Sequence, residues 1–250
     1  MSSASPATYG LLGMLSVRSW TGYELTQQVR RSLRFVWPCS EGHLYREQRR
    51  LVDLGWATVE QEFAGQRSRK RYTITPAGRA ALGQWLTTPP EEPHFQVEGV
   101  LRMFFADQGS TADLVSAMQS TRQLARSMLD EMVGFVGEYL DHGGPLWMLE
   151  AGVGGTVGGR MQYRGRTMYP ERLHVVALAI DITTQLLDTL DRFLTATTRE
   201  VGSWPNPTHP SLTQATRTRL ESIRGRTPGQ DRRRSRIGSA AQRRAVSDLC

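Results

Sequence analysis

Apolar residues recur at helical spacing in four short segments of the N-terminal region. Each segment starts with a residue type that favours a helix N-cap, namely Ser5, Thr21, Ser40 and Thr75. In the third segment, residues 40–56, Leu44, Leu51 and Leu54 share one face and Gly55 is a natural stop. The pattern therefore predicts four helices, the last of which ends before Pro89.

Between the third and fourth helices, apolar and polar residues alternate with the period of a β-strand. Thr58–Phe63 and Arg71–Thr75 show this alternation, and Gly65 lies in the turn between them. Three helices, a hairpin and a fourth helix, in this order, predict a winged helix-turn-helix domain over residues 1–88.

Longer helical patterns follow a proline-rich stretch at residues 87–95, which predicts a domain boundary. The first is a short helix with one buried stripe, formed by Val97, Val100, Leu101, Phe104 and Phe105. A long helix then begins at Ser110, and a last helix covers residues 171–201. In each of these two long helices, apolar residues recur alternately three and four positions apart and form a seam along one face. We expect a mainly α-helical protein with a small β-wing, whose C-terminal helical region, residues 95–201, serves dimerisation.

The last helix carries a second apolar stripe beside its seam, formed by Val175, Ala179, Ile182, Leu186 and Phe193. A helix that is apolar on two sides must bury both. One side can face its own chain, and the other predicts a partner subunit and therefore a homodimer. An intramolecular helical hairpin is the alternative.

Two segments lack a sustained apolar period. Residues 143–170 contain eight glycines and interrupt the helical pattern. Residues 202–250 are rich in Pro, Ser, Thr, Gly and Arg, which predicts a disordered basic tail. Its run Arg232–Arg236 either raises nonspecific affinity for DNA or only keeps the chain in solution.

The charges are distributed unevenly along the 250 residues, whose formal net charge is +7. Residues 1–90 carry twelve basic and six acidic side chains, residues 91–210 carry nine and fifteen, and residues 211–250 carry ten and three. Basic segments attract polyanions, so the N-terminal segment is expected to bind nucleic acid.

Several function classes lack the residues that they need. The two cysteines, Cys39 and Cys250, cannot form a disulfide framework, and we find no secretion signal and no run of 18 apolar residues. We therefore expect a cytoplasmic protein without a membrane span. The five histidines are scattered, and no nucleophile–base spacing is recognisable, so no metal, cofactor or catalytic residue is expected. The glycine run at 152–159 lacks the lysine of a phosphate-binding loop.

The third helix carries the candidate contacts to DNA bases. A recognition helix enters the major groove with its N-terminal residues at the base edges, and the side chains within reach are Ser40, His43, Tyr45, Arg46, Arg49 and Arg50. Arg46 is the candidate for a bidentate pair with guanine. Alternatively, Arg49 and Arg50 only solvate the helix or pair with Glu47 or Asp53, and Tyr45 is a core aromatic residue with its hydroxyl outward.

The hairpin carries four cations within five residues, Arg67, Arg69, Lys70 and Arg71. Such a cluster suits phosphates or the minor groove, and a solvated loop is the alternative. Thr21 and Tyr23 open the second helix, where free backbone N–H groups could bind a phosphate. A further prediction is an apolar effector cleft between helices of a dimer, and the alternative is that its residues are ordinary core. The candidate residues are Phe104, Phe105, Met132, Phe135 and Trp147.

Three blocks of the N-terminal region have the order and spacing of a known regulator family. They are YGLLGMLSVRSWTGYEL (9–25), GHLYREQRRLVDLGW (42–56) and RKRYTITPAGRAAL (69–82). In these blocks the chain resembles the PadR family of bacterial transcription regulators. The resemblance implies a homodimer that binds double-stranded DNA at a palindromic operator, often as a repressor, and in some members is released by a small-molecule effector. We expect a DNA-binding regulator and not an enzyme. A winged-helix adaptor without specific DNA binding is the alternative.

Overall fold

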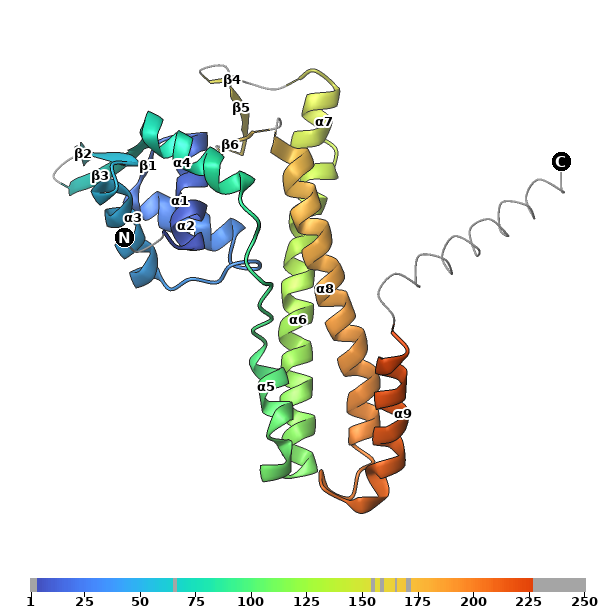
Figure 1. The fold of residues 1–250 in the computed structure, drawn as a ribbon. Coiled ribbons are helices and arrows are strands. Elements are labelled where there is room, and N and C mark those ends of the chain that lie inside the picture. The colour runs from blue at the N-terminus through green and yellow to red at the C-terminus, as the bar shows by residue number, and fades with distance from the viewer. Residues whose placement is uncertain are drawn as a thin grey trace, which may run out of the picture. The chain divides into compact units, whose positions relative to one another are not determined.

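The structure is a computed structural model that describes residues 4–64, 67–153, 156–157, 160–164, 166–169 and 172–226. The chain divides into two compact units, and Figure 1 labels their helices and strands. The first unit consists of Met1–Gln96 and Arg126–Thr189, and the second consists of Val97–Ala125 and Leu190–Cys250. Both long helices therefore contribute one part to each unit.

The four N-terminal helices begin where their cap residues predict. They are α1 (Pro6–Val17), α2 (Gly22–Ser32), α3 (Glu41–Asp53) and α4 (Pro76–Thr87). The side chain of each predicted cap accepts a hydrogen bond from a backbone N–H of the first turn, which satisfies a group that the helix leaves unpaired. Helix α3 ends three residues before the predicted Trp56, because Gly55 has φ +70° and turns the chain out of the helix.

A three-stranded antiparallel sheet completes the predicted winged helix-turn-helix. Its strands are β1 (Trp20–Thr21), β2 (Ala57–Ala64) and β3 (Arg67–Ile74), in the order β1-β3-β2. Strands β2 and β3 pair from Ala57↔Ile74 to Ala64↔Arg67, so β3 begins four residues before the predicted Arg71. Two residues are too few for a period-two signal, and β1 was not predicted. Gly65, predicted in the turn, lies outside the described residues.

This domain has a closed apolar core. Eleven buried residues from α1, α2, α3 and the sheet form one cluster, in which Leu11, Leu25 and Leu51 have no exposed surface. Leu44 and Leu51 both face this core, as predicted, but Leu54 is 39% exposed. Leu54 is the C-cap of α3, so it lies beyond the point where the helical spacing applies.

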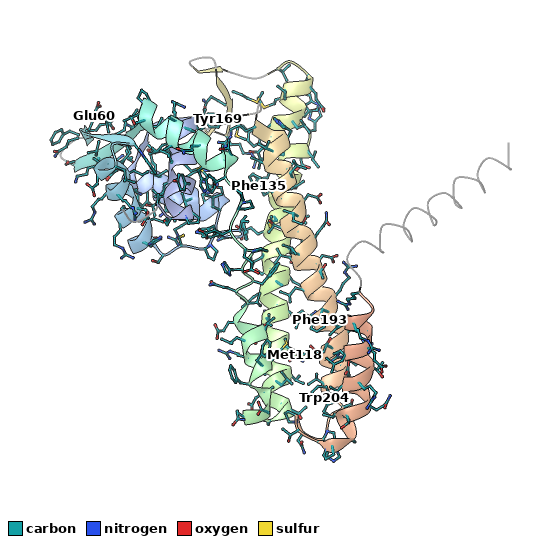
Figure 2. All side chains as sticks on the ribbon, viewed as in Figure 1. Glu60, Met118, Phe135, Tyr169, Phe193 and Trp204 are labelled. Atoms are coloured by element: carbon teal, nitrogen blue, oxygen red, sulfur yellow. The ribbon has the colours of Figure 1, made fainter. Side chains whose placement is uncertain are left out.

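The helical region consists of α5 (Glu98–Phe104), α6 (Thr111–Leu140) and α8 (Leu173–Val201), which confirms the three predicted helices. A short 3-10 turn, η1 (Ala106–Gln108), joins α5 to α6. In the second unit, Leu114 and Met118 of α6 pack with Leu194 and Val201 of α8, and Trp204 covers the end of this cluster (Figure 2). The Nε of Arg122 donates to Asp191 Oδ1 at 2.9 Å and ties the two helices together.

Two apolar surfaces of the helical region are not covered by the residues that the structure describes. The predicted buried stripe of α5 is exposed, by 57% at Leu101 and 79% at Phe104, so this expectation is wrong; only Gly99 of α5 is buried. The second stripe of α8 is also open, since Ile182, Leu186 and Phe193 are each at least half exposed. By length and composition alone, α8 is also long and apolar enough to cross a membrane. Of its most apolar stretch of 18 residues, 6% is buried. The sequence pattern had predicted no such segment.

Regular structure also occurs where none was predicted. The glycine-rich segment contains α7 (Pro145–Glu150) and a small antiparallel sheet of β4 (Thr156–Val157), β5 (Arg160–Tyr163) and β6 (Arg166–Thr167). After α8, a 3-10 turn η3 (Pro210–Leu212) leads into α9 (Thr213–Arg224). Arg219 of α9 pairs with Glu200 of α8 at 2.6 Å. The predicted disordered tail is therefore wrong for residues 210–224, whereas Arg232–Arg236 and Cys250 lie outside the described residues.

Candidate nucleic-acid interface

Helix α3 is held in place by two buried polar residues on its inner face. Glu47 accepts hydrogen bonds from the hydroxyls of Thr8 and Ser5, both of which belong to the start of α1. Gln48 has no exposed surface, and its Nε2 donates to the Gly22 carbonyl at 3.0 Å and to Thr26 Oγ1 at 2.9 Å. Because side-chain hydrogen bonds are directional, these contacts determine how α3 crosses α1 and α2.

The opposite face of α3 is cationic. Successive residues of a helix are about 100° apart, so Arg46 and Arg49 point away from buried Leu44, Glu47 and Gln48. Both arginines are exposed. His43 and Arg50 lie on one flank of that face and are half-buried. Arg46 and Arg49 are therefore the side chains that a ligand approaching α3 meets first.

Tyr45 lies on the other flank of α3, half-buried. A Cβ atom added to Gly22 would lie 3.8 Å from a ring carbon of Tyr45 and 3.3 Å from a ring carbon of Tyr72. The two rings therefore enclose the first turn of α2, which supports the alternative that Tyr45 is a packing residue. Burial raises the pKa of Tyr72, the positive charge of Arg49 opposes this shift, and Tyr45 adds to it.

The start of α2 uses its polar groups internally. Thr21 is 4% exposed, and its hydroxyl accepts the Glu24 N–H at 3.3 Å, while Glu24 Oε2 accepts the Thr21 N–H at 2.9 Å. Burial alone would raise the pKa of Glu24, but the hydrogen bonds from Thr21 and the charges of Arg18 and Arg71 bring it below its usual value. The buried Thr21 hydroxyl thus serves the helix, and Tyr23, which is 66% exposed, is the outward-facing residue here.

The four cations of the hairpin are not equivalent. Arg71 forms an ion pair with Glu62, and its Nη1 donates to the Ser19 carbonyl at 3.4 Å. The hydrogen bond to Glu62 raises the pKa of Arg71 further, against the effect of burial. Arg69 and Lys70 are exposed. The side chain of Arg67 lies outside the described residues, although its backbone pairs with Ala64.

A family model, described as the transcriptional regulator PadR-like family, matches residues 11–84 of this chain. We call residues 11–84 the PadR-like domain after this match. The match covers α2, α3 and the whole hairpin, and it ends inside α4. The family consists of transcriptional regulators and not of enzymes, in agreement with the expected lack of catalytic residues.

The PadR-like domain extends the comparison to curated relatives. The chain is 25% identical over 128 residues to the negative transcriptional regulator PadR of Bacillus subtilis, which covers 50% of this chain and 70% of that protein. It is 31% identical over 84 residues to the probable transcriptional regulator Rv1176c of Mycobacterium tuberculosis, covering 32% of this chain and 43% of that one. The resemblance predicted from the three sequence blocks is thereby confirmed.

Among solved structures, the fold is similar to that of Bacillus subtilis PadR in complex with operator DNA. The TM-score is 0.58 at 18% identity, and the match covers 78% of this chain and 98% of that chain. The structural similarity thus includes helices beyond the PadR-like domain and confirms the winged-helix fold class.

Sequence reasoning found the outward residues of this interface and missed the inward ones. Ser40, whose hydroxyl caps α3 at 3.3 Å from the His43 nitrogen, was predicted as a DNA contact and is already engaged. Glu47 and Gln48 were overlooked as positioning residues. Their signal was their spacing, since polar residues three and four positions after Leu44 fall on the same side of a helix.

The five candidate effector residues are divided between the two units. Phe104, with Met103, lines a cavity of about 370 Å³ in the second unit, together with Phe193, Val201 and Trp204. Met132, Phe135 and Trp147 belong to the first unit, where Phe135 packs on Tyr139 and Trp147 packs on His142. Phe105 is 63% exposed. An effector site made by these residues remains a prediction.

Proposed function

We propose that this protein is a transcriptional repressor that binds a two-fold symmetric DNA operator as a homodimer. The observation that carries the proposal is the cationic outer face of α3, with Arg46 and Arg49 exposed and the helix anchored from behind by Glu47 and Gln48. A recognition helix needs both features, because base readout requires exposed donors in a fixed position.

The open apolar surfaces support the dimer. Large contiguous apolar patches are uncommon on monomeric proteins and mark interaction sites. The stripe of α8 is such a patch, and its length suits a second helix of the same kind. Asp181, Asp188 and Asp191 on the same helix disfavour a bilayer as the partner that covers it. We propose a cytoplasmic protein without a membrane span.

Two features of relatives support repression and release by an effector. The Bacillus subtilis relative is named a negative regulator, and a structure of Bacillus subtilis PadR in complex with p-coumaric acid has a TM-score of 0.53 to this chain at 18% identity. We therefore propose that a small aromatic compound lowers the affinity of this protein for its operator.

Footprinting on the DNA upstream of its own gene tests the proposal. We expect two protected half-sites related by a dyad, with centres about one helical turn or a multiple of it apart. Random-sequence competitor DNA should not remove the protection. A winged-helix adaptor would instead give no protected site above the competitor, and that result would overturn the proposed function.

A further inference from the structure

The register of the hairpin divides its cations between two faces. Residues directly opposite one another in β2 and β3 point to the same side, and the side alternates along each strand. The pairs Glu60↔Arg71 and Glu62↔Arg69 share one face. The pairs Gln61↔Lys70 and Phe63↔Ser68 share the other. Lys70 therefore points away from the two arginines that flank it.

The face of Arg69 and Arg71 is neutralised by carboxylates. Each arginine lies opposite a glutamate, and Arg71 is bonded diagonally to Glu62. Arg71 also reaches the Ser19 carbonyl, which ties β1 to the hairpin. This face has two positive and two negative charges in its described part, and it serves the sheet itself. Figure 2 labels Glu60 on this hairpin.

The face of Lys70 carries no acidic side chain among the described residues of β2 and β3. Gln61 Nε2 donates to Ser68 Oγ at 2.7 Å, so this polar surface is already ordered. Phe63, close to the tip of the hairpin, is 72% exposed. A ring that is this exposed does not contribute to the core. Phe63 and Lys70 together offer a ligand one apolar contact and one charged contact.

The face of Lys70 continues into the surface around α3. Tyr72 follows Lys70 on the same side of β3, about 7 Å further along the strand. The Tyr72 hydroxyl is within electrostatic reach of Arg49, one of the two outward arginines of α3. Tyr72 is 6% exposed, and its ring and that of Tyr45 in α3 both approach Gly22. The side of β3 that carries Lys70 is therefore the side that faces α3, whereas Arg69 points to the reverse side of the sheet.

We propose that the wing contacts duplex DNA through the face of Lys70, Gln61, Ser68 and Phe63, and that Arg69 and Arg71 instead stabilise the hairpin. Lys70 binds a backbone phosphate, and Phe63 packs against the sugars or base edges of the adjacent minor groove. This inference rests on the proposed function and adds which face of the wing makes the contact.

Neighbouring residues of one strand provide the matched test. Lys70→Ala and Arg69→Ala each remove one exposed cation from β3, but from opposite faces. Affinity for the footprinted operator is measured by fluorescence anisotropy between 0.05 and 0.3 M salt. For Lys70→Ala we expect the slope of log affinity against log salt concentration to become less steep by about 0.9 per bound chain. This change corresponds to a loss of roughly five-fold in affinity at 0.15 M salt. For Arg69→Ala we expect less than half of that change in slope. Circular dichroism melting verifies that both variants fold.

An equal or larger change of slope for Arg69→Ala than for Lys70→Ala would overturn the assignment of the face. Phe63→Ala should lower the affinity for the operator without changing the salt slope, and Phe63→Leu should lower it less. An unaltered affinity for Phe63→Ala would exclude the proposed apolar contact. A wild-type protein that binds no operator would overturn the proposed function itself, and the two failures are therefore distinguishable.

Chemical labelling of amines tests the proposed contact of Lys70 independently, without any substitution. Lys70 is the one lysine among the 31 basic residues of the sequence. We expect operator DNA to protect Lys70 from acetylation by an amine-reactive reagent, measured by mass spectrometry with the N-terminal amine as the internal reference. Equal labelling of Lys70 with and without operator would contradict the proposed contact.

Discussion

The PadR-like domain and the helical region bury their apolar residues in different ways. The domain encloses eleven buried residues in one cluster made by three helices and a sheet. The helical region gathers four buried residues in its own cluster and leaves Leu101, Phe104 and Ile182 more than half exposed. Since burial of apolar surface is the main source of folding free energy, the domain has its own closed core, whereas the helical region keeps apolar surface open for the partner subunit that we propose. The proposed DNA contact and the proposed dimer contact thus lie in separate parts of the sequence.

The strongest test of this difference between the two regions is to place charges on the open stripe of α8. In Ile182→Glu/Leu186→Glu we expect a monomer by sedimentation equilibrium, because two buried carboxylates at a partner interface are costly. Operator affinity should fall by about a hundred- to ten-thousand-fold, since each chain then binds its half-site alone.

Gln185→Glu is the control for this variant, because residue 185 is exposed and polar on the same helix and the substitution adds the same type of charge. We expect it to remain a dimer with nearly unchanged affinity. A double variant that stays dimeric and binds normally would show that this stripe is not the interface.

The second prediction concerns the outer face of the PadR-like domain. Arg46→Ala should weaken operator binding by about 1–3 kcal/mol and relax the preference at one base pair of each half-site. The free energy of unfolding should hardly change, because Arg46 is exposed. Arg79→Ala removes the same charge from α4 and serves as the control. Unaltered affinity and base preference in Arg46→Ala would disprove the assigned role.

The third prediction compares one close helix contact from each region. A Cβ added to Gly78 of α4 would overlap the backbone carbonyl of Trp56, whereas one added to Gly99 of α5 would overlap the Thr121 side chain. The Trp56 carbonyl is held in place because it accepts the Thr75 N–H at 3.0 Å. Helix α5 is short and largely exposed, so it can move as a whole away from Thr121, whose Cβ would lie 2.8 Å from the added atom. We expect Gly78→Ala to lower the free energy of unfolding by about 1–3 kcal/mol and Gly99→Ala to lower it by less. Urea denaturation followed by circular dichroism measures both, and the reverse order would contradict this account of the two contacts.

The smallest effect is expected at the capping box of α2. The pKa of Glu24 is below its usual value of 4.5 in the folded protein, so ionised Glu24 stabilises the fold above that pH. Glu24→Gln should cost a few tenths to about 1 kcal/mol at pH 7. The difference from wild type should vanish as the pH falls through the folded-state pKa. Glu92→Gln, in the exposed linker, is the control; a pH-independent difference for Glu24→Gln would exclude the electrostatic explanation.

Predictions from sequence succeeded where one residue and its near neighbours decide the outcome. Ser5, Thr21, Ser40 and Thr75 capped their helices as expected, because a cap involves only the next three residues. Contacts between distant residues were missed. The spacing of Glu47 and Gln48 from Leu44 places them on the inner face of α3, but it does not identify their partners, which are Thr8, 39 positions away, and Gly22, 26 positions away.

The two faces of the hairpin also show the difference between what local sequence predicts and what contacts between distant residues decide. Four cations in five residues are evident from the sequence, but their partners depend on the register of β2 against β3. A shift of one residue would exchange the two faces and place Arg69 where Lys70 lies.

The order of residues along the chain was therefore sufficient to establish the winged helix-turn-helix, its caps and the likeness to PadR regulators, because these follow from spacing and composition. Tertiary structure alone decided which cations point outward, which polar residues hold α3, and which apolar stripes remain open. Those properties arise when segments far apart in the chain come together, and pairing and packing at that range are not encoded in any single short stretch of residues.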